Sequence, residues 1–203
     1  QDFEQWNTRD FGKPFSDPKH GMLPPKVARM IVNIAKSALT KTMGGIKTPI
    51  LLDPFCGTGT ILVEALTVGC LPIGADISEQ AIEKSRKNVA WARARFALKP
   101  EAINVFACDA THVSDVVKSP VHAIVTEPYM GNTNASDFGR VIEYEKAKNI
   151  IKGLEKLYIG CLREWSKILV TGGIIVMALP QYSLGKETLF VKKVIDRCEI
   201  LGY

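Results

Sequence analysis

Short apolar runs alternate with longer segments of helical periodicity along most of this chain. This order is typical of βαβ units, in which a helix connects two parallel strands. It predicts an α/β fold: a Rossmann-like, doubly wound and mostly parallel sheet with helices on both faces. The predicted strands are 49–53, 71–75, 103–107, 121–125 and 168–178, and the predicted helices are 25–43, 60–68, 78–97, 143–167 and 186–197.

The helix before the first strand carries apolar side chains at helical spacing, which predicts that they form its buried face. They are Val27, Met30, Ile31, Ile34, Ala35 and Leu39. Residues 199–201 are expected to begin a sixth strand. The length predicts one compact domain, with residues 1–45 as an N-terminal segment and helix before the sheet and residues 46–203 as the Rossmann-like core.

The composition is ordinary for a globular protein, with 46% hydrophobic and 23% charged residues. No apolar run reaches the roughly 18 to 20 residues that a membrane-spanning helix needs, so we expect no membrane partner and a cytoplasmic location. The five cysteines form no C-x-x-C pair and the three histidines are scattered, so no metal site is expected. Because the chain begins at Gln1 and ends at Tyr203 directly after an apolar run, we expect a fragment whose sheet is truncated at the C-terminal end.

The charge balance is mildly positive, with a formal net charge of +5. Such a balance favours an anionic partner such as RNA. The densest basic stretch runs from Lys84 to Lys99 on a predicted helix, where a solvated face explains it better than a nucleic-acid site.

Four consecutive predicted strands end on or beside an acidic residue: Asp53, Asp76, Asp109 and Glu127. Carboxylates are rare in protein cores, and ligands of doubly wound sheets bind beyond the carboxyl ends of the strands. Because the four acids hold equivalent positions, they predict one shared polar site at this edge of the sheet.

The turn after the first strand, from Asp53 to Thr60, reads D-P-F-C-G-T-G-T. Glycines two apart in such a turn permit positive φ and let the backbone approach a ligand closely. A dinucleotide-binding fingerprint would have a third glycine at position 62, where Leu62 stands, and this counts against a nicotinamide dehydrogenase. Asp76 can accept hydrogen bonds from a ribose diol, or alternatively cap the next helix.

The run D-P-F-C-G-T-G-T, followed by G-A-D-I and then C-D-A, is similar to the cofactor motifs of class I S-adenosylmethionine-dependent methyltransferases. The resemblance implies that the glycine turn lies under the methionine part of S-adenosylmethionine. It also implies that Asp76 holds the ribose hydroxyls, that Asp109 with Ala110 meets the adenine, and that Asp53 holds the ammonium through water. The cofactor-binding residues implied are Asp53, Cys56, Gly57, Gly59, Asp76, Ile77, Asp109 and Ala110.

The segment from Gly21 to Arg29 reads G-M-L-P-P-K-V-A-R and makes the family resemblance more specific. Together with the glycine turn it resembles tRNA guanosine-N2 methyltransferases that carry a separate RNA-binding THUMP domain upstream. The likeness covers residues from about 10 to 180. It implies methylation of the exocyclic N2 amine of a guanosine in tRNA, with RNA as the partner. No THUMP-like region is present in this sequence, so by this resemblance the upstream RNA-binding domain was removed, is another chain, or never existed in this protein.

The sequence Thr126-Glu127-Pro128-Tyr129 follows the fourth strand, where amino-methylating enzymes usually carry Asp or Asn, then Pro-Pro and an aromatic residue. By resemblance, Glu127 and the Pro128 carbonyl accept hydrogen bonds from the target amine, and Tyr129 stacks on the base. Glu127 is longer by one methylene, and a shift of about 1 Å can cost on the order of 100-fold in rate.

Three interpretations of Glu127 therefore stay open. Glu127 reaches an RNA amine through an adjusted loop, or the target is an amino group in DNA or protein, or the domain is a catalytically weak cofactor-binding scaffold. The polar segment 130–140 is expected to border the substrate or to be a plain connection.

Overall fold

The computed structural model describes residues 3–16, 22–98, 104–131 and 143–203. Its main sheet contains β1 (Ile50–Asp53), β2 (Leu71–Asp76), β3 (Asn104–Ala107), β4 (Val121–Thr126) and β5 (Leu169–Met177). The strands lie in the order β3-β2-β1-β4-β5, and every neighbouring pair is parallel. The predicted Rossmann-like, doubly wound α/β fold is confirmed.

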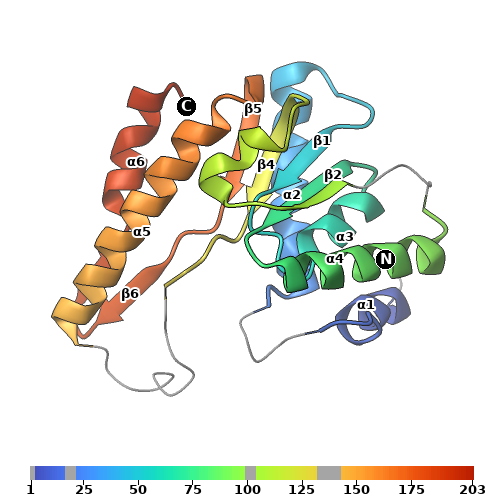
Figure 1. The fold of residues 1–203 in the computed structure, drawn as a ribbon, viewed down its shortest axis with the longest axis horizontal. Coiled ribbons are helices and arrows are strands. Elements are labelled where there is room, and N and C mark those ends of the chain that lie inside the picture. The colour runs from blue at the N-terminus through green and yellow to red at the C-terminus, as the bar shows by residue number, and fades with distance from the viewer. Residues whose placement is uncertain (1–2, 17–21, 99–103, 132–142) are drawn as a thin grey trace.

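Helices cover both faces of this sheet (Figure 1). They are α1 (Phe3–Phe11), α2 (Pro25–Met43), α3 (Thr60–Thr67), α4 (Glu79–Phe96), α5 (Tyr144–Trp165) and α6 (Lys192–Cys198), with the 3-10 helices η2 (Ala110–Asp115) and η4 (Glu199–Leu201). Buried side chains of α2, α3 and α4 pack on one face, and those of η2, α5 and α6 pack on the other. Two separate core layers therefore hold the central strands between them.

The central strands are apolar on both sides because both faces of the sheet are covered. In β1, Leu51 packs with the α2 and α3 side chains, whereas the next residue, Leu52, packs with those of α5. In β4, Ala123 and Val125 face the first layer and Ile124 faces the second. This alternation follows from the two-residue period of a strand and explains the continuous apolar runs in the sequence.

The prediction for the buried face of α2 is wrong in part. Val27, Met30 and Ile34 are 40%, 62% and 56% exposed, and the buried apolar residues are Ala28, Val32, Ala35 and Leu39. The helix is rotated relative to the predicted face because Arg29 points inward, where its Nε donates to Glu64 Oε2 on α3 at 2.8 Å. Small side chains at 28 and 35 also let α2 lie close to β4 and β5.

The C-terminal region also differs from the prediction. The first part of the predicted helix 186–197 belongs to an antiparallel hairpin of β6 (Gln181–Leu184) and β7 (Glu187–Phe190), and α6 begins only at Lys192. Gly185, with a φ of 64°, makes the hairpin turn at a conformation that costs little without a Cβ. Residues 199–201, predicted to begin a strand, form η4 instead, which ends at Gly202 with a φ of 89°.

The N-terminal residues contain a helix that was not predicted. A buried ion pair holds α1 against α3: Arg9 Nε of α1 lies 3.0 Å from Glu64 Oε1 of α3. The guanidinium of Arg9 also lies 4.3 Å from the centre of the Trp6 ring. Most of the predicted loop 130–140 lies outside the described residues. Within the described ranges, none of the helices combines the length and apolar character needed to cross a bilayer.

Candidate active site

The strand order brings the four predicted acids to one edge of the sheet. Asp53 ends β1 and Asp76 ends the neighbouring β2, while Glu127 directly follows β4 on the other side of β1. Asp109 follows β3 after one intervening residue, Cys108. Parallel strands present their carboxyl ends at the same edge, so the sheet order itself assembles this acidic row.

A cavity of about 280 Å³ lies beside this row. Its lining includes Asp53 and Glu127 together with Cys56, Gly57 and Thr58 of the glycine turn. Asp76, Ile77, Asp109 and Ala110 do not line it, so the structure separates the expected cofactor residues into a cavity group and a group along the neighbouring sheet edge. Gly59 lies between the lining residues Thr58 and Thr60, but it faces Ser85 of α4 and not the cavity.

The two glycines of the turn have different tasks. Gly57 has a φ of 50°, and a Cβ added there would meet nothing within 4 Å, because the residue faces open space at the cavity. Gly59 has a φ of 84°, and an added Cβ would lie 2.5 Å from Ser85 Oγ on α4. Gly57 therefore leaves room for a ligand against the backbone, and Gly59 lets α3 and α4 approach each other.

Asp76 holds the glycine turn in place. Its Oδ2 accepts a hydrogen bond from Gly57 N at 2.9 Å, and its Oδ1 accepts one from Ser78 N at 2.9 Å. The residue that caps α4 is Ser78 and not Asp76, because the Ser78 hydroxyl accepts a hydrogen bond from Ala81 N in the first turn of that helix. Next to Asp76, the side chain of Ile77 is 76% exposed and offers an apolar surface beside the carboxylate.

Asp53 is a buried carboxylate with its own hydrogen-bond donors. It is 1% exposed, and its Oδ1 accepts from Thr126 Oγ1 at 2.7 Å and from Phe55 N at 3.2 Å. Burial raises the pKa of Asp53 to about 7, although both hydrogen bonds oppose the shift. Asp76 and Glu127 add negative charge nearby, so this end of the cavity suits a cation.

Glu127, Pro128 and Tyr129 form a short segment directly after β4. Glu127 lines the cavity, and burial raises the pKa of its carboxyl. Pro128 is buried, whereas the Tyr129 side chain is 51% exposed. The segment therefore places an acceptor in the cavity and an aromatic ring at the surface.

Two tyrosines hold this segment in place through hydrogen bonds, and the sequence did not predict either of them as a site residue. Tyr158 on α5 donates its hydroxyl to the Tyr129 carbonyl at 2.6 Å, and Tyr182 on β6 donates to the Met130 carbonyl at 2.9 Å. They lie 29 and 52 residues further along the chain than their partners. No local sequence signal identifies such contacts.

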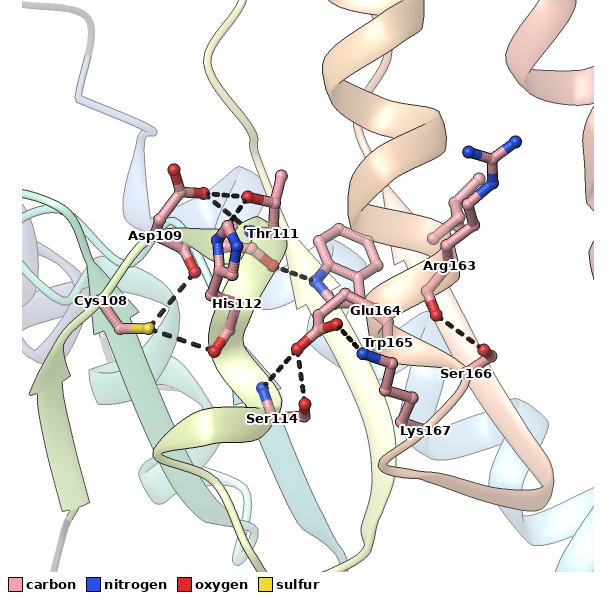
Figure 2. A network of polar contacts seen from close by, with 12 residues as sticks. Cys108, Asp109, Thr111, His112, Ser114, Arg163, Glu164, Trp165, Ser166 and Lys167 are labelled. Atoms are coloured by element: carbon pink, nitrogen blue, oxygen red, sulfur yellow. Dashed lines mark hydrogen bonds and ion pairs between the residues drawn. The ribbon is translucent and has the colours of Figure 1, made fainter.

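Asp109 lies in a network of polar contacts between η2 and α5 (Figure 2). Asp109 Oδ1 accepts from the backbone nitrogen and the hydroxyl of Thr111, each at 2.8 Å, and the backbone bond is the main cause that lowers the pKa of Asp109. Trp165 Nε1 donates to the Ala110 carbonyl at 3.2 Å. The second oxygen of Asp109 points away from Thr111 in Figure 2. The network holds that carboxylate at the sheet edge.

The cavity also has lining residues for which the sequence predicted no part in the site. Met22 and Leu23 lie within the motif from Gly21 to Arg29, which is the sequence feature that could have predicted their place at the site. Lys84 on α4 belongs to the basic stretch interpreted as a solvated face. In the described parts of the chain, no three His, Cys, Asp or Glu side chains come together as a metal-binding group.

A comparison with known protein families shows the family of this chain. The family described as RMKL-like, methyltransferase domain, matches residues 16–195. The chain belongs to this family. A tRNA (guanine(10)-N2)-dimethyltransferase from Methanothermobacter thermautotrophicus is 35% identical over 176 residues, which cover 86% of this chain and 43% of that protein.

Two further proteins are similar to this chain. A protein of the same name from Pyrococcus abyssi is 31% identical over 72% of this chain and 37% of its own length. The chain thus spans less than half of either relative. The solved rRNA methyltransferase AviRa from Streptomyces viridochromogenes shares the fold, with a TM-score of 0.53, 17% identity and 91% coverage of each chain.

Proposed function

We propose that this chain is the catalytic domain of an S-adenosylmethionine-dependent RNA methyltransferase that methylates the exocyclic N2 amine of a guanosine in tRNA. The observation that carries the proposal is that Glu127, the residue after β4, lines one cavity with Asp53 and the glycine turn. A target amine at Glu127 and a methyl donor over the turn would then share one compartment. The names of the relatives support tRNA as the substrate.

The described residues fit the cofactor. The open space at Gly57 accommodates a ligand against the turn, and the acidic end at Asp53 suits the cofactor's ammonium. Asp76 accepts ribose hydroxyls, since each carboxylate oxygen can accept more than one hydrogen bond. Ile77 offers an apolar surface to the adenine, whose amino group meets the second oxygen of Asp109 beside Ala110. When bound, S-adenosylmethionine supplies an electrophilic methyl group.

The chain itself positions the nucleophile. The Glu127 carboxylate and the Pro128 carbonyl accept hydrogen bonds from the target amine, which directs its lone pair toward the cavity. Methyl transfer is an in-line displacement, so this positioning supplies much of the rate. A burial-raised pKa suits Glu127 to take up the proton that the methylated nitrogen releases. Tyr129, at the surface, stacks on the unstacked base.

The proposal also covers the boundaries of the domain, the way in which tRNA is selected and the location of the protein. Residues 46–203 form the methyltransferase core, and residues 1–45 form an N-terminal segment with α1 attached to α3. An RNA-binding domain elsewhere in the protein selects the tRNA, because a net charge of +5 is too small for specific recognition. A tRNA-modifying role suits a cytoplasmic location.

Mass spectrometry of nucleosides from total tRNA tests the substrate. We expect N2-methylguanosine to be lost when the gene is deleted, and to return with the wild-type gene but not with Glu127→Ala. An unchanged profile would overturn the tRNA assignment and leave the DNA, protein or scaffold interpretations.

Calorimetry tests the cofactor separately. Folded wild-type protein should bind S-adenosylmethionine, and Asp76→Ala should bind it at least ten-fold more weakly, on the order of one charge-assisted hydrogen bond. Absence of binding by the folded wild type would contradict the whole proposal. Binding without methyl transfer to any nucleic acid would favour the scaffold interpretation, which the unusual length of Glu127 keeps open.

A further inference from the structure

The cavity contains a positive charge that the proposed chemistry does not yet use. Among its described lining residues, Lys84 of α4 is the one with a cationic side chain, and it is half-buried. Asp53 and Glu127 line the same cavity. The compartment therefore carries charges of both signs.

Lys84 differs from its basic neighbours on α4. Arg86 donates to the Val105 carbonyl at 2.6 Å, and Lys87 pairs with Glu83 at 2.6 Å. In the described parts of the chain, no carboxylate lies within ion-pair distance of the Lys84 ammonium. A lysine that lines a cavity and has no ion-pair partner among the described residues is available to a ligand.

The neighbourhood of Lys84 favours a small carboxylate over a nucleic-acid phosphate. Thr58 of the glycine turn and Thr60, the first residue of α3, line the same cavity, and the positive end of the helix dipole favours an anion there. A phosphate backbone in this compartment would meet the negative charges of Asp53 and Glu127, whereas a free amino-acid group carries an ammonium for the acids and a carboxylate for the lysine. The cavity thus complements a zwitterion.

We infer that Lys84, together with the first turn of α3, binds the α-carboxylate of the methionine part of S-adenosylmethionine. This inference rests on the proposed function, because it assigns one group of the proposed cofactor. It assigns to Lys84 a role in selecting ligands that retain the amino-acid group. Of the remaining basic residues of α4, Arg86, Lys87 and Arg95 are exposed, as the predicted solvated face requires, whereas two guanidinium nitrogens of Arg93 are buried.

Calorimetry with three ligands isolates the carboxylate. S-adenosylhomocysteine has the complete amino-acid group, decarboxylated S-adenosylhomocysteine (S-adenosyl-3-thiopropylamine) lacks only the carboxylate, and 5′-methylthioadenosine lacks the whole amino-acid group. For the full chain, we expect Lys84→Gln to weaken S-adenosylhomocysteine binding about 10- to 100-fold, which is the range of a charge-assisted hydrogen bond. Binding of the other two ligands should change less than about two-fold.

Two further variants complete the design. Lys84→Arg retains the charge and should restore most of the affinity for S-adenosylhomocysteine. Lys87→Gln removes the same charge three residues further along α4, where the side chain does not line the cavity, so it should leave all three affinities nearly unchanged. A large effect of Lys87→Gln would mean that net charge, not a contact, governs binding, and would overturn the inference.

The other outcomes separate the inference from the proposed function. If the wild type binds S-adenosylhomocysteine and Lys84→Gln binds it equally well, or loses equal affinity for all three ligands, the inference is wrong and the proposed function stands. If Lys84→Gln weakens tRNA binding but not S-adenosylhomocysteine binding, a phosphate contact replaces it. If the folded wild type binds none of the three ligands, the proposed function fails, and the inference fails with it.

Discussion

The Asp53 carboxylate accepts a hydrogen bond from the Thr126 hydroxyl at 2.7 Å, which joins the ends of the adjacent strands β1 and β4. Thr126 directly precedes Glu127, so the same bond sets the proposed acceptor of the target amine beside the acidic end of the cavity. Both residues of the pair are buried. This bond therefore links Asp53 to the segment that begins with Glu127.

Asp53 should reduce the stability of the folded protein at neutral pH. Its pKa rises from 3.8 to about 7 on folding, so the folded state holds this proton more tightly than the unfolded state. The contribution of Asp53 to stability is therefore fully present below pH 4 and is lost as the pH rises to about 7, with a loss on the order of 4 kcal/mol. Asp53→Asn keeps an oxygen that can accept from Thr126.

Urea denaturation at several pH values checks this. We expect Asp53→Asn to resemble the wild type below pH 4, and its advantage in stability to grow with pH to about 4 kcal/mol at pH 8. Asp196→Asn, at an exposed position on α6, should show no such pH-dependent gain. A constant difference between Asp53→Asn and wild type across the range would contradict the raised pKa.

Cofactor binding should release a proton from Asp53. The carboxyl is about half protonated near pH 7, and the ligand's ammonium stabilises its ionised form. Titration of S-adenosylhomocysteine in buffers of different ionisation enthalpy should show release of up to about 0.5 proton at pH 7, and almost none at pH 8.5. Asp53→Asn should abolish this release. Equal release by the variant would assign the proton to another group.

Glu127 should matter for turnover and not for cofactor affinity. Removing its carboxylate in Glu127→Ala leaves the target amine without its acceptor, so we expect kcat to fall on the order of 100-fold. The affinity for S-adenosylhomocysteine should stay within about two-fold, because the glycine turn and Asp76 are untouched. Glu187→Ala, at an exposed position on β7, is the matched control. Full activity of Glu127→Ala would remove this residue from the mechanism.

Tyr158 and Tyr182 should act as positioning residues. Replacing either by Phe removes the hydroxyl that fixes the carbonyl of Tyr129 or Met130, so the segment after Glu127 loses a constraint. We expect kcat to fall about 10-fold with little change in cofactor affinity. Tyr203→Phe removes a similar 2.6 Å bond, to the Leu162 carbonyl, away from the site and should keep full turnover. Equal loss in all three variants would indicate a general structural effect.

Glu64 should be essential for the attachment of α1. It is fully buried between Arg9 and Arg29, so Glu64→Ala leaves two buried guanidinium groups without their carboxylate. We expect a loss of about 3 to 5 kcal/mol in unfolding free energy and faster proteolysis within α1. Glu83→Ala, whose partner Lys87 is exposed, should leave stability almost unchanged. A Glu64→Ala variant as stable as the wild type would show that the buried pair is dispensable.

The sequence alone determined the α/β class, the five strands of the main sheet and the row of acids at their ends. These are local signals: Leu51 and Leu52 are apolar because both faces of β1 are covered, and Asp53 stands where the strand ends. A parallel order then brings successive strand ends to one edge, whatever the details of packing.

Only the tertiary structure decided the rotation of α2, the β6–β7 hairpin and the contacts that hold the catalytic segment. Periodicity cannot show that Arg29 turns inward, because its partner Glu64 lies 35 residues away. It cannot pair Tyr182 with the Met130 carbonyl across 52 residues, nor place Lys84 in the cavity with Glu127. These choices depend on which distant side chains meet in the packed core, and a local pattern carries no information about them.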